Sequence, residues 1–181
     1  MELTINKTRV VCLTGNLTTE EVDAIVNAAN PELTGGGGVD GAIHYAAGPQ
    51  LDRECRELAA RIKRLEPGRA AMTSGGNLKA KHVIHTVGPI WKGGREGEEN
   101  ILRRAHKNCL LLAADQGLKS LAFPAISTGA YKYPKLRAAL AAVDETAAFL
   151  RADTRLELVK FVLFEDDIRR MYEDALKLCG S

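Results

Sequence analysis

Four consecutive glycines at residues 35–38 separate a short apolar run at residues 24–26 from a helical pattern that begins at Val39. Glycine lets the backbone adopt positive φ and approach a ligand closely. A helix that starts directly after such glycines also points unpaired N–H groups at the same place, which favours an anion. The stretch 27–48 therefore predicts a buried strand, a phosphate-binding loop and a helix in direct succession.

Two polar side chains stand at the edges of this loop, Asn30 before the glycines and Asp40 after them. Asn30 could orient a substrate or a water molecule, and Asp40 could accept a proton. The loop lacks the Lys-Ser/Thr pair of a P-loop and the spaced glycines of the dinucleotide-binding fingerprint. The alternative is a flexible surface loop whose following Asp40 only complements the helix dipole.

The rest of the chain alternates strand and helix patterns, which predicts an α/β domain with a largely parallel, helix-covered sheet. No linker or repeat divides it, so residues 1–181 are expected to form a single domain. Strands are expected at residues 9–14, 24–27, 70–74, 82–87, 120–125 and 156–164, with a further strand at 3–5 paired to the first. Helices are expected at residues 39–47, 51–65, 98–116, 135–150 and 167–178.

Composition narrows the class of protein. A formal net charge of +2 and 5% aromatic residues argue against a nucleic-acid-binding protein. No apolar run approaches the roughly 20 residues that span a bilayer, and the first residues do not resemble a signal peptide. The cysteines, Cys12, Cys55, Cys109 and Cys179, lack metal-ligand spacing. We therefore expect reduced thiols, a cytoplasmic location, no membrane partner, no metal site and no cofactor.

A second loop follows the strand expected at residues 120–125. Ser127, Thr128, Gly129 and Ala130 offer hydroxyls, small side chains and accessible N–H groups. In parallel sheets, ligands bind beyond the carboxyl ends of the strands, where this loop would meet the glycine loop. Two anion-binding loops in one crevice suit a diphosphate. The alternative is an ordinary strand-to-helix turn in which Ser and Thr act as caps.

Together the two loops resemble the macrodomain family, and in particular its ADP-ribosylhydrolases of the MacroD type and the bacterial O-acetyl-ADP-ribose deacetylases. The matching segments are residues 23–30, 35–48, 83–91 and 123–131, in the family's order. The resemblance implies a three-layer α/β/α domain with a mixed, about six-stranded sheet and ADP-ribose bound across one edge of it.

The resemblance also implies roles for matching positions. Asn16 and Leu17 would contact the adenine, and Phe164 would offer it an aromatic face. The diphosphate would be held by Gly36, Gly37, Gly38 and Val39 in the first loop and by Ser127, Thr128, Gly129 and Ala130 in the second. Asp40, Asn30 and Tyr131 would form the catalytic group around the distal ribose.

The implied reaction is hydrolysis of an ester on the distal ribose, either the acetyl ester of ADP-ribose or the bond to an acidic side chain of a mono-ADP-ribosylated protein. Asp40 could act as the general base, a role typically worth about 10²–10⁴-fold in rate. Alternatively, a phosphate oxygen of the substrate accepts the proton and Asp40 only orients the water. The other hypothesis for the whole protein is a module that binds ADP-ribose without cleaving it, for which the Asp40 carboxylate would be unnecessary.

Two positions depart from the family pattern. Asn16 replaces the usual aspartate, so the acceptor for the adenine amino group lacks a charge. Lys132 replaces the glycine of the usual Tyr-Gly-Tyr and either attracts the diphosphate or extends into solvent. The histidines His44, His82 and His85 are interpreted as core or surface residues, and Trp91 is expected to pack against the domain.

Overall fold

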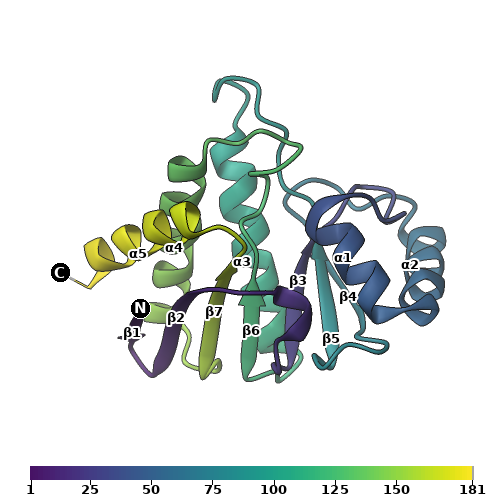
Figure 1. Cartoon of the computed structure of the whole chain (residues 1–181), viewed down its shortest axis with the longest axis horizontal. Helices are drawn as coiled ribbons and strands as arrows, with labels where there is room; N and C mark the ends of the chain where they lie inside the picture. The colour runs from purple at the N-terminus through teal and green to yellow at the C-terminus, as the bar shows by residue number, and fades with distance from the viewer. Residues whose placement is uncertain (181) are drawn as a thin grey trace.

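The computed structural model describes residues 1–180, which form a mixed sheet with helices on both faces (Figure 1). The seven strands are β1 (Glu2–Ile5), β2 (Thr8–Thr14), β3 (Ala24–Ala28), β4 (Ala70–Ser74), β5 (His82–Thr86), β6 (Ser120–Phe123) and β7 (Leu158–Leu163). The helices are α1 (Gly38–Ala47), α2 (Pro49–Ile62), α3 (Glu98–Asp115), α4 (Lys135–Ala152) and α5 (Asp166–Cys179), and a 3₁₀ turn, η1, covers Leu17–Thr19.

The strands are arranged in the order β1-β2-β7-β6-β3-β5-β4. The five inner strands run parallel, whereas β1 and β4 pair antiparallel at the two edges. The predicted α/β/α architecture with a mixed sheet is confirmed. The sheet has seven strands rather than about six, because the short N-terminal strand β1 extends it beyond β2.

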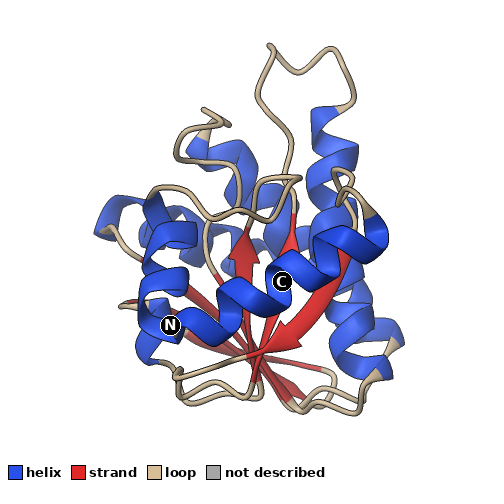
Figure 2. Ribbon diagram, turned by 90° about the vertical axis from the view of Figure 1, so that its right-hand side faces the viewer, coloured by secondary structure: helices blue, strands red, loops and turns tan. Residues whose placement is uncertain are grey.

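The helices form two layers, seen on either side of the sheet in Figure 2. Helices α1 and α2 cover one face of β3, β5 and β4, where Ile25, Val83 and Leu51 are fully buried. Helices α3, α4 and α5 cover the other face, where Phe123 and Phe161 lie at the centre of a larger apolar cluster. Alternate residues along β3 therefore enter different clusters, as the strand geometry requires.

Three boundaries differ from the sequence-based expectation for local reasons. Helix α2 begins at Pro49, two residues earlier than expected, because proline suits the first turn of a helix. It ends at Ile62, before Lys63 at φ +66°. Strand β6 ends at Phe123, since the following Pro124 has no N–H to continue the ladder. No helix within residues 1–180 is long and apolar enough to cross a membrane.

Candidate active site

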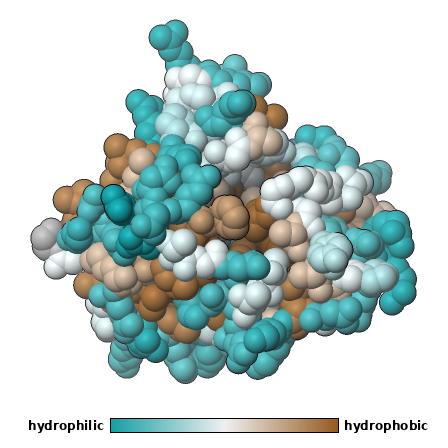
Figure 3. All heavy atoms as spheres, viewed as in Figure 1, coloured by the Kyte–Doolittle hydropathy of each residue, from teal (hydrophilic) through white to brown (hydrophobic). Residues whose placement is uncertain are grey.

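The carboxyl ends of the five parallel strands open into one cavity of about 770 Å³. In Figure 3 this face is hollowed near its centre, with hydrophobic side chains in the depression and polar ones at its margins. All fourteen substrate-binding positions expected from the sequence line the cavity: Asn16, Leu17, Asn30, Gly36, Gly37, Gly38, Val39, Asp40, Ser127, Thr128, Gly129, Ala130, Tyr131 and Phe164. The two loops therefore meet, as the parallel sheet predicts.

The first loop (residues 30–40) ends in the N-terminal turn of α1. Among residues 1–180, the N–H groups of Gly36, Gly37 and Gly38 donate to no backbone carbonyl. A Cβ added at Gly37 or Gly38 would meet no atom within 4 Å. The open space and the free donors lie on the cavity, so this backbone can accept an anion at a helix N-terminus.

Asp40 lies in the first turn of α1 and is 6% exposed. Its Oδ1 accepts a hydrogen bond of 2.8 Å from Asn27 Nδ2, while its Oδ2 accepts none from the residues described here. Burial raises the pKa of this carboxyl, although the Asn27 bond and the nearby His44 counteract the rise. The carboxylate thus has two protein neighbours at Oδ1, while Oδ2 is free to act on a ligand or water.

His44 is a neighbour of Asp40 that the sequence interpretation missed. Its Nε2 lies 3.4 Å from Asp40 Oδ1, and its Nδ1 lies 2.7 Å from Asp52 Oδ1. The imidazole also packs beneath the glycines, since a Cβ on Gly35 would touch it at 3.4 Å. The spacing of four residues between Asp40 and His44 on one helix was the available signal, because such residues share a face.

Asn30 follows β3 and lines the cavity, but its polar atoms hold the first loop together. Its Nδ2 donates to Gly35 O at 2.9 Å and to Thr34 Oγ1 at 3.0 Å, and its Oδ1 accepts from Thr34 N at 3.1 Å. The amide therefore shapes the loop in this structure, and Nδ2 could donate to a ribose hydroxyl only by exchanging one of its two bonds.

The second loop (residues 125–131) presents its backbone to the cavity. The hydroxyl of Thr128 donates to Ala125 O at 2.9 Å, and the Ser127 hydroxyl is buried without a partner in residues 1–180. Ser127 has φ +67°, and a Cβ on Gly88 would come within 2.1 Å of its Oγ. Both residues line the cavity, and the predicted contact of their hydroxyls with a diphosphate stays a prediction. The N–H groups of Gly129, Ala130 and Tyr131 donate to no backbone carbonyl in the described chain.

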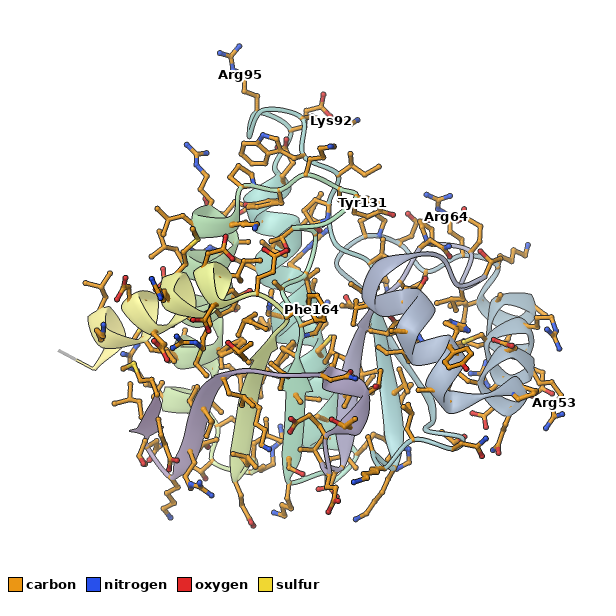
Figure 4. The ribbon with its side chains drawn as sticks, viewed as in Figure 1. Arg53, Arg64, Lys92, Arg95, Tyr131 and Phe164 are labelled. Carbon is orange, nitrogen blue, oxygen red and sulfur yellow. The ribbon has the colours of Figure 1, made fainter. Side chains whose placement is uncertain are left out.

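A third segment supports the second loop from outside. Trp91 N donates to Tyr131 O at 2.8 Å, and its ring packs edge-on against Tyr133 at 4.8 Å, with the Arg137 guanidinium 5.5 Å above it. Trp91 therefore packs against the domain as predicted. The tip that follows it, with Lys92 and Arg95, projects away from the cavity above Tyr131 (Figure 4).

Glu98 anchors that tip. It is 2% exposed, and it accepts hydrogen bonds from the N–H groups of Lys92, Gly94 and Glu96 at 2.8–3.0 Å. Burial opposes ionisation of Glu98, but the backbone N–H bonds outweigh it and lower the pKa to about 2. The carboxylate thus fixes residues 92–98 at neutral pH.

The far end of the cavity contains the positions expected to contact adenine. Phe164, directly after β7, is 89% exposed and lies near the centre of the face in Figure 4, and Leu17 is buried in the cavity wall. Asn16 Oδ1 accepts from Thr18 N at 3.0 Å and from Thr18 Oγ1 at 2.8 Å, which caps η1. The oxygen that the sequence assigned to the adenine amino group is therefore already engaged.

Lys132 is exposed and does not line the cavity. Its backbone has φ +58°, in the left-handed region. This explains why glycine is usual at this position in the family that the sequence resembles, since glycine adopts that conformation without steric cost. Of the two alternatives for its side chain, the structure favours solvent.

Comparison with known proteins identifies close relatives. The Macro domain family model matches residues 26–142. An O-acetyl-ADP-ribose deacetylase of Enterobacter cloacae subsp. cloacae is 51% identical over 175 residues, covering 97% of each chain. One from Salmonella typhimurium is 47% identical, covering 96% of this chain and 97% of that protein.

Solved structures agree with the sequence relatives. An Oceanobacillus iheyensis macrodomain with ADP superimposes with a TM-score of 0.94 at 41% identity, covering 98% of this chain and 95% of that one. A Trypanosoma brucei macrodomain in complex with ADP-ribose gives a TM-score of 0.84 at 39% identity, covering 94% of this chain and 69% of that one.

Proposed function

This chain belongs to the macrodomain family, and from that premise we propose that it is a hydrolase that deacetylates O-acetyl-ADP-ribose. Relatives that carry the name O-acetyl-ADP-ribose deacetylase match nearly the whole chain at about half identity. The observation that carries the proposal within this molecule is Asp40, a buried carboxylate with one free oxygen at the cavity between two anion-binding loops.

The diphosphate would lie between the two loops. The first loop offers the N–H groups of the α1 N-terminus, and the second offers those of residues 129–131. Neither loop places a lysine or arginine side chain there, so backbone donors and the helix dipole would carry the anion. Phe164 would stack on the adenine, which positions the distal ribose at the opposite end, near Asp40 and Tyr131.

Hydrolysis then needs a water molecule at the acyl carbon and a group to accept its proton. The water oxygen adds to the carbonyl carbon, the bond between acyl carbon and ribose oxygen breaks, and the ribose oxygen takes a proton, which leaves acetate and ADP-ribose. Asp40 Oδ2 is suited to accept the proton from water, because burial raises its pKa and thereby its basicity. Proton acceptance by a substrate phosphate, with Asp40 orienting the water, is the alternative route in the same site.

We further propose that the enzyme acts in the cytoplasm as a single domain and removes mono-ADP-ribose that is ester-linked to acidic side chains of proteins. The same ester chemistry at the distal ribose supports this second substrate class. Tyr131 at the cavity rim is the predicted closing residue, and Asn30 is the predicted orienting residue once it releases Thr34 or Gly35.

The deciding experiment incubates the protein with O-acetyl-ADP-ribose and follows the release of acetate and ADP-ribose, with an acetylated amine as a control for nonspecific hydrolysis. A parallel assay uses a protein mono-ADP-ribosylated on glutamate. Saturable binding of ADP-ribose without release of either product would instead establish the non-catalytic binding module.

A further inference from the structure

A row of polar side chains lies under α1 and α2, although apolar residues surround it. Asn27 on β3, His85 on β5 and Thr73 on β4 project from three neighbouring strands onto one face of the sheet, and they are 0%, 0% and 7% exposed. Asn27 and His85 are direct register partners. Burying three polar groups together is costly unless they bond to one another.

Their hydrogen bonds form a single chain that ends at Asp40. Thr73 Oγ1 lies 2.9 Å from His85 Nε2 and 3.2 Å from the Ser74 carbonyl oxygen. His85 Nδ1 lies 3.1 Å from Asn27 Nδ2, which also donates to Asp40 Oδ1 at 2.8 Å. Among the described residues, Asn27 Oδ1 has no partner.

The bond directions in this chain follow from its two ends. The ionised Asp40 carboxylate can only accept, so the Asn27 amide nitrogen faces it and also faces His85 Nδ1, which leaves the ring proton on Nε2. The Thr73 hydroxyl donates to the Ser74 carbonyl, so its oxygen accepts from His85 Nε2–H. His85 Nδ1 is then an acceptor, and it accepts one hydrogen of the Asn27 amide. The second hydrogen of that amide goes to Asp40. Reversing the amide would place its oxygen against both the Asp40 carboxylate and Nδ1.

The side chains that surround His85, from helices α1 and α2 and the neighbouring strands, favour the neutral form of its ring. Cys55 Sγ on α2 lies 3.8 Å from Nε2, and burial raises the pKa of this thiol to about 12, so it carries no charge at neutral pH. Burial, with a smaller contribution from His44, lowers the pKa of His85 to about 3 despite the opposing charge of Glu54. The charges of Asp40 on α1 and of Asp52 and Glu54 on α2 also act on Cys55 beside the ring.

We propose that His85 is a positioning residue: as the neutral Nε2–H tautomer, it holds the Asn27 amide in the orientation that donates to Asp40 and thereby sets the direction and basicity of the Asp40 carboxylate. His85 touches neither substrate nor water in this scheme, and it acts only through Asn27. The expected effect of His85 on turnover rests on the proposed hydrolytic function of the site. The tautomer of His85 and the orientation of the Asn27 amide do not depend on that function.

Two substitutions of His85 separate the roles of its nitrogens. In His85→Asn, the side-chain amide oxygen occupies the place of Nδ1 and can still accept from Asn27. In His85→Gln, the terminal amide reaches the place of Nε2 and keeps the bond to Thr73 but offers Asn27 no acceptor. His106→Gln is the matched control, because His106 is equally buried but lies on α3 at the other face of the sheet, beside Phe123.

We expect His85→Gln to lower kcat for O-acetyl-ADP-ribose about tenfold or more, with KM changed less than about threefold, because the reacting carboxylate is misdirected while the binding loops stay intact. His85→Asn should retain kcat within about threefold, and His106→Gln should match the parent. Equal kcat in His85→Gln and His85→Asn, or an equal loss in His106→Gln, would overturn the proposal and leave the hydrolase assignment intact.

Two spectroscopic measurements decide the same question without turnover. The ¹⁵N chemical shifts of His85 in the parent protein should show the Nε2–H tautomer at neutral pH, and a protonated ring or the Nδ1–H tautomer would refute the proposal. The pKa of Asp40, followed by ¹³C NMR, should be higher in His85→Gln than in His85→Asn by about one unit or more, because the carboxylate loses a well-oriented donor to its charged form. If the parent does not hydrolyse the ester, the proposed function fails and these two measurements still test the positioning role.

Discussion

The two loops that face each other across the cavity both present free N–H groups to an anion, but their side chains differ. The first loop combines glycines with a buried side-chain network, in which Asp40 accepts a hydrogen bond from Asn27 and its Oδ1 lies 3.4 Å from His44 Nε2. The second loop offers the cavity the N–H groups of residues 129–131 and the Tyr131 side chain, while the Thr128 hydroxyl donates to Ala125 O and the Ser127 hydroxyl is buried. The two loops thus differ in that the buried carboxylate belongs to the first.

The loops also differ in how they reach left-handed backbone conformations. The first loop has Leu33 at φ +58° together with Gly35 and Gly38 at φ +78° and +58°. The second has no glycine in this region: Ser127 adopts φ +67°, and Lys132, directly after the loop, adopts φ +58°. Non-glycine residues resist this region, so the second loop depends on its outer support from Trp91 and Tyr133 to keep its shape.

The largest contrast between the loops should come from Asp40→Ala. Turnover of O-acetyl-ADP-ribose should fall about 100-fold or more, since the general-base role is typically worth about 10²–10⁴-fold. Affinity for ADP-ribose should stay within about tenfold, or about 1.4 kcal/mol, because the backbone donors remain. Steady-state kinetics and calorimetry on the same preparations test this. Turnover at the parental rate would remove Asp40 from the reaction and end the division of labour between the loops.

Gly129→Val should show the converse pattern in the second loop. A Cβ at Gly129 meets no atom within 4 Å of the protein, so the fold should tolerate the change, while the branched side chain crowds the anion-binding backbone. We expect affinity for ADP-ribose to fall about tenfold or more, with kcat at saturating substrate less affected. Gly41→Ala is the comparison for folding, because its Cβ would lie 2.3 Å from the Gly36 carbonyl oxygen. A lower thermal midpoint in Gly129→Val with affinity intact would make this loop structural.

Lys132→Gly tests the backbone difference between the loops. Left-handed conformation costs an L-residue about 1–2 kcal/mol, and the greater freedom of glycine in the unfolded chain offsets about 0.5–1 kcal/mol of that gain. The variant should therefore be more stable by about 0.5–1 kcal/mol in urea denaturation, while affinity for ADP-ribose stays the same. A clear loss of affinity would instead show that the lysine charge attracts the diphosphate.

Asn16→Asp should give the smallest effect. Asn16 Oδ1 already accepts two hydrogen bonds from Thr18, so a carboxylate would first strengthen the cap of η1. We expect affinity for ADP-ribose to change less than about threefold, or about 0.6 kcal/mol, and the inosine analogue to respond equally. A larger gain in affinity for ADP-ribose than for the inosine analogue would show that the side chain at this position contacts the adenine amino group in addition to capping η1.

The fold was largely predictable because its signals are local. Strand and helix patterns, Gly48-Pro49 as a break and the glycine run each act within a few residues, and the parallel sheet then brings both loops to one edge. The predicted site positions all line the cavity, although their roles stay predictions.

The directions in which the side chains of the site point could not be predicted from the sequence. Ser127 adopts a left-handed backbone conformation and its hydroxyl is buried, neither of which the sequence indicates. Asn27 and His85 meet because β3 and β5, more than fifty residues apart in sequence, pair in a particular register. His44 was the exception, since its spacing from Asp40 was visible in the sequence.

The contact between Trp91 and the second loop makes the protein a natural fluorescent reporter. Trp91 is the only tryptophan in the sequence, so its emission has a single source. Its amide donates a hydrogen bond to the Tyr131 carbonyl, and its ring contacts Tyr133 and Arg137. If Tyr131 closes over a bound nucleotide as predicted, the surroundings of the one emitting ring will change. Occupancy of the second loop can be followed in real time by stopped-flow fluorescence, without any attached dye.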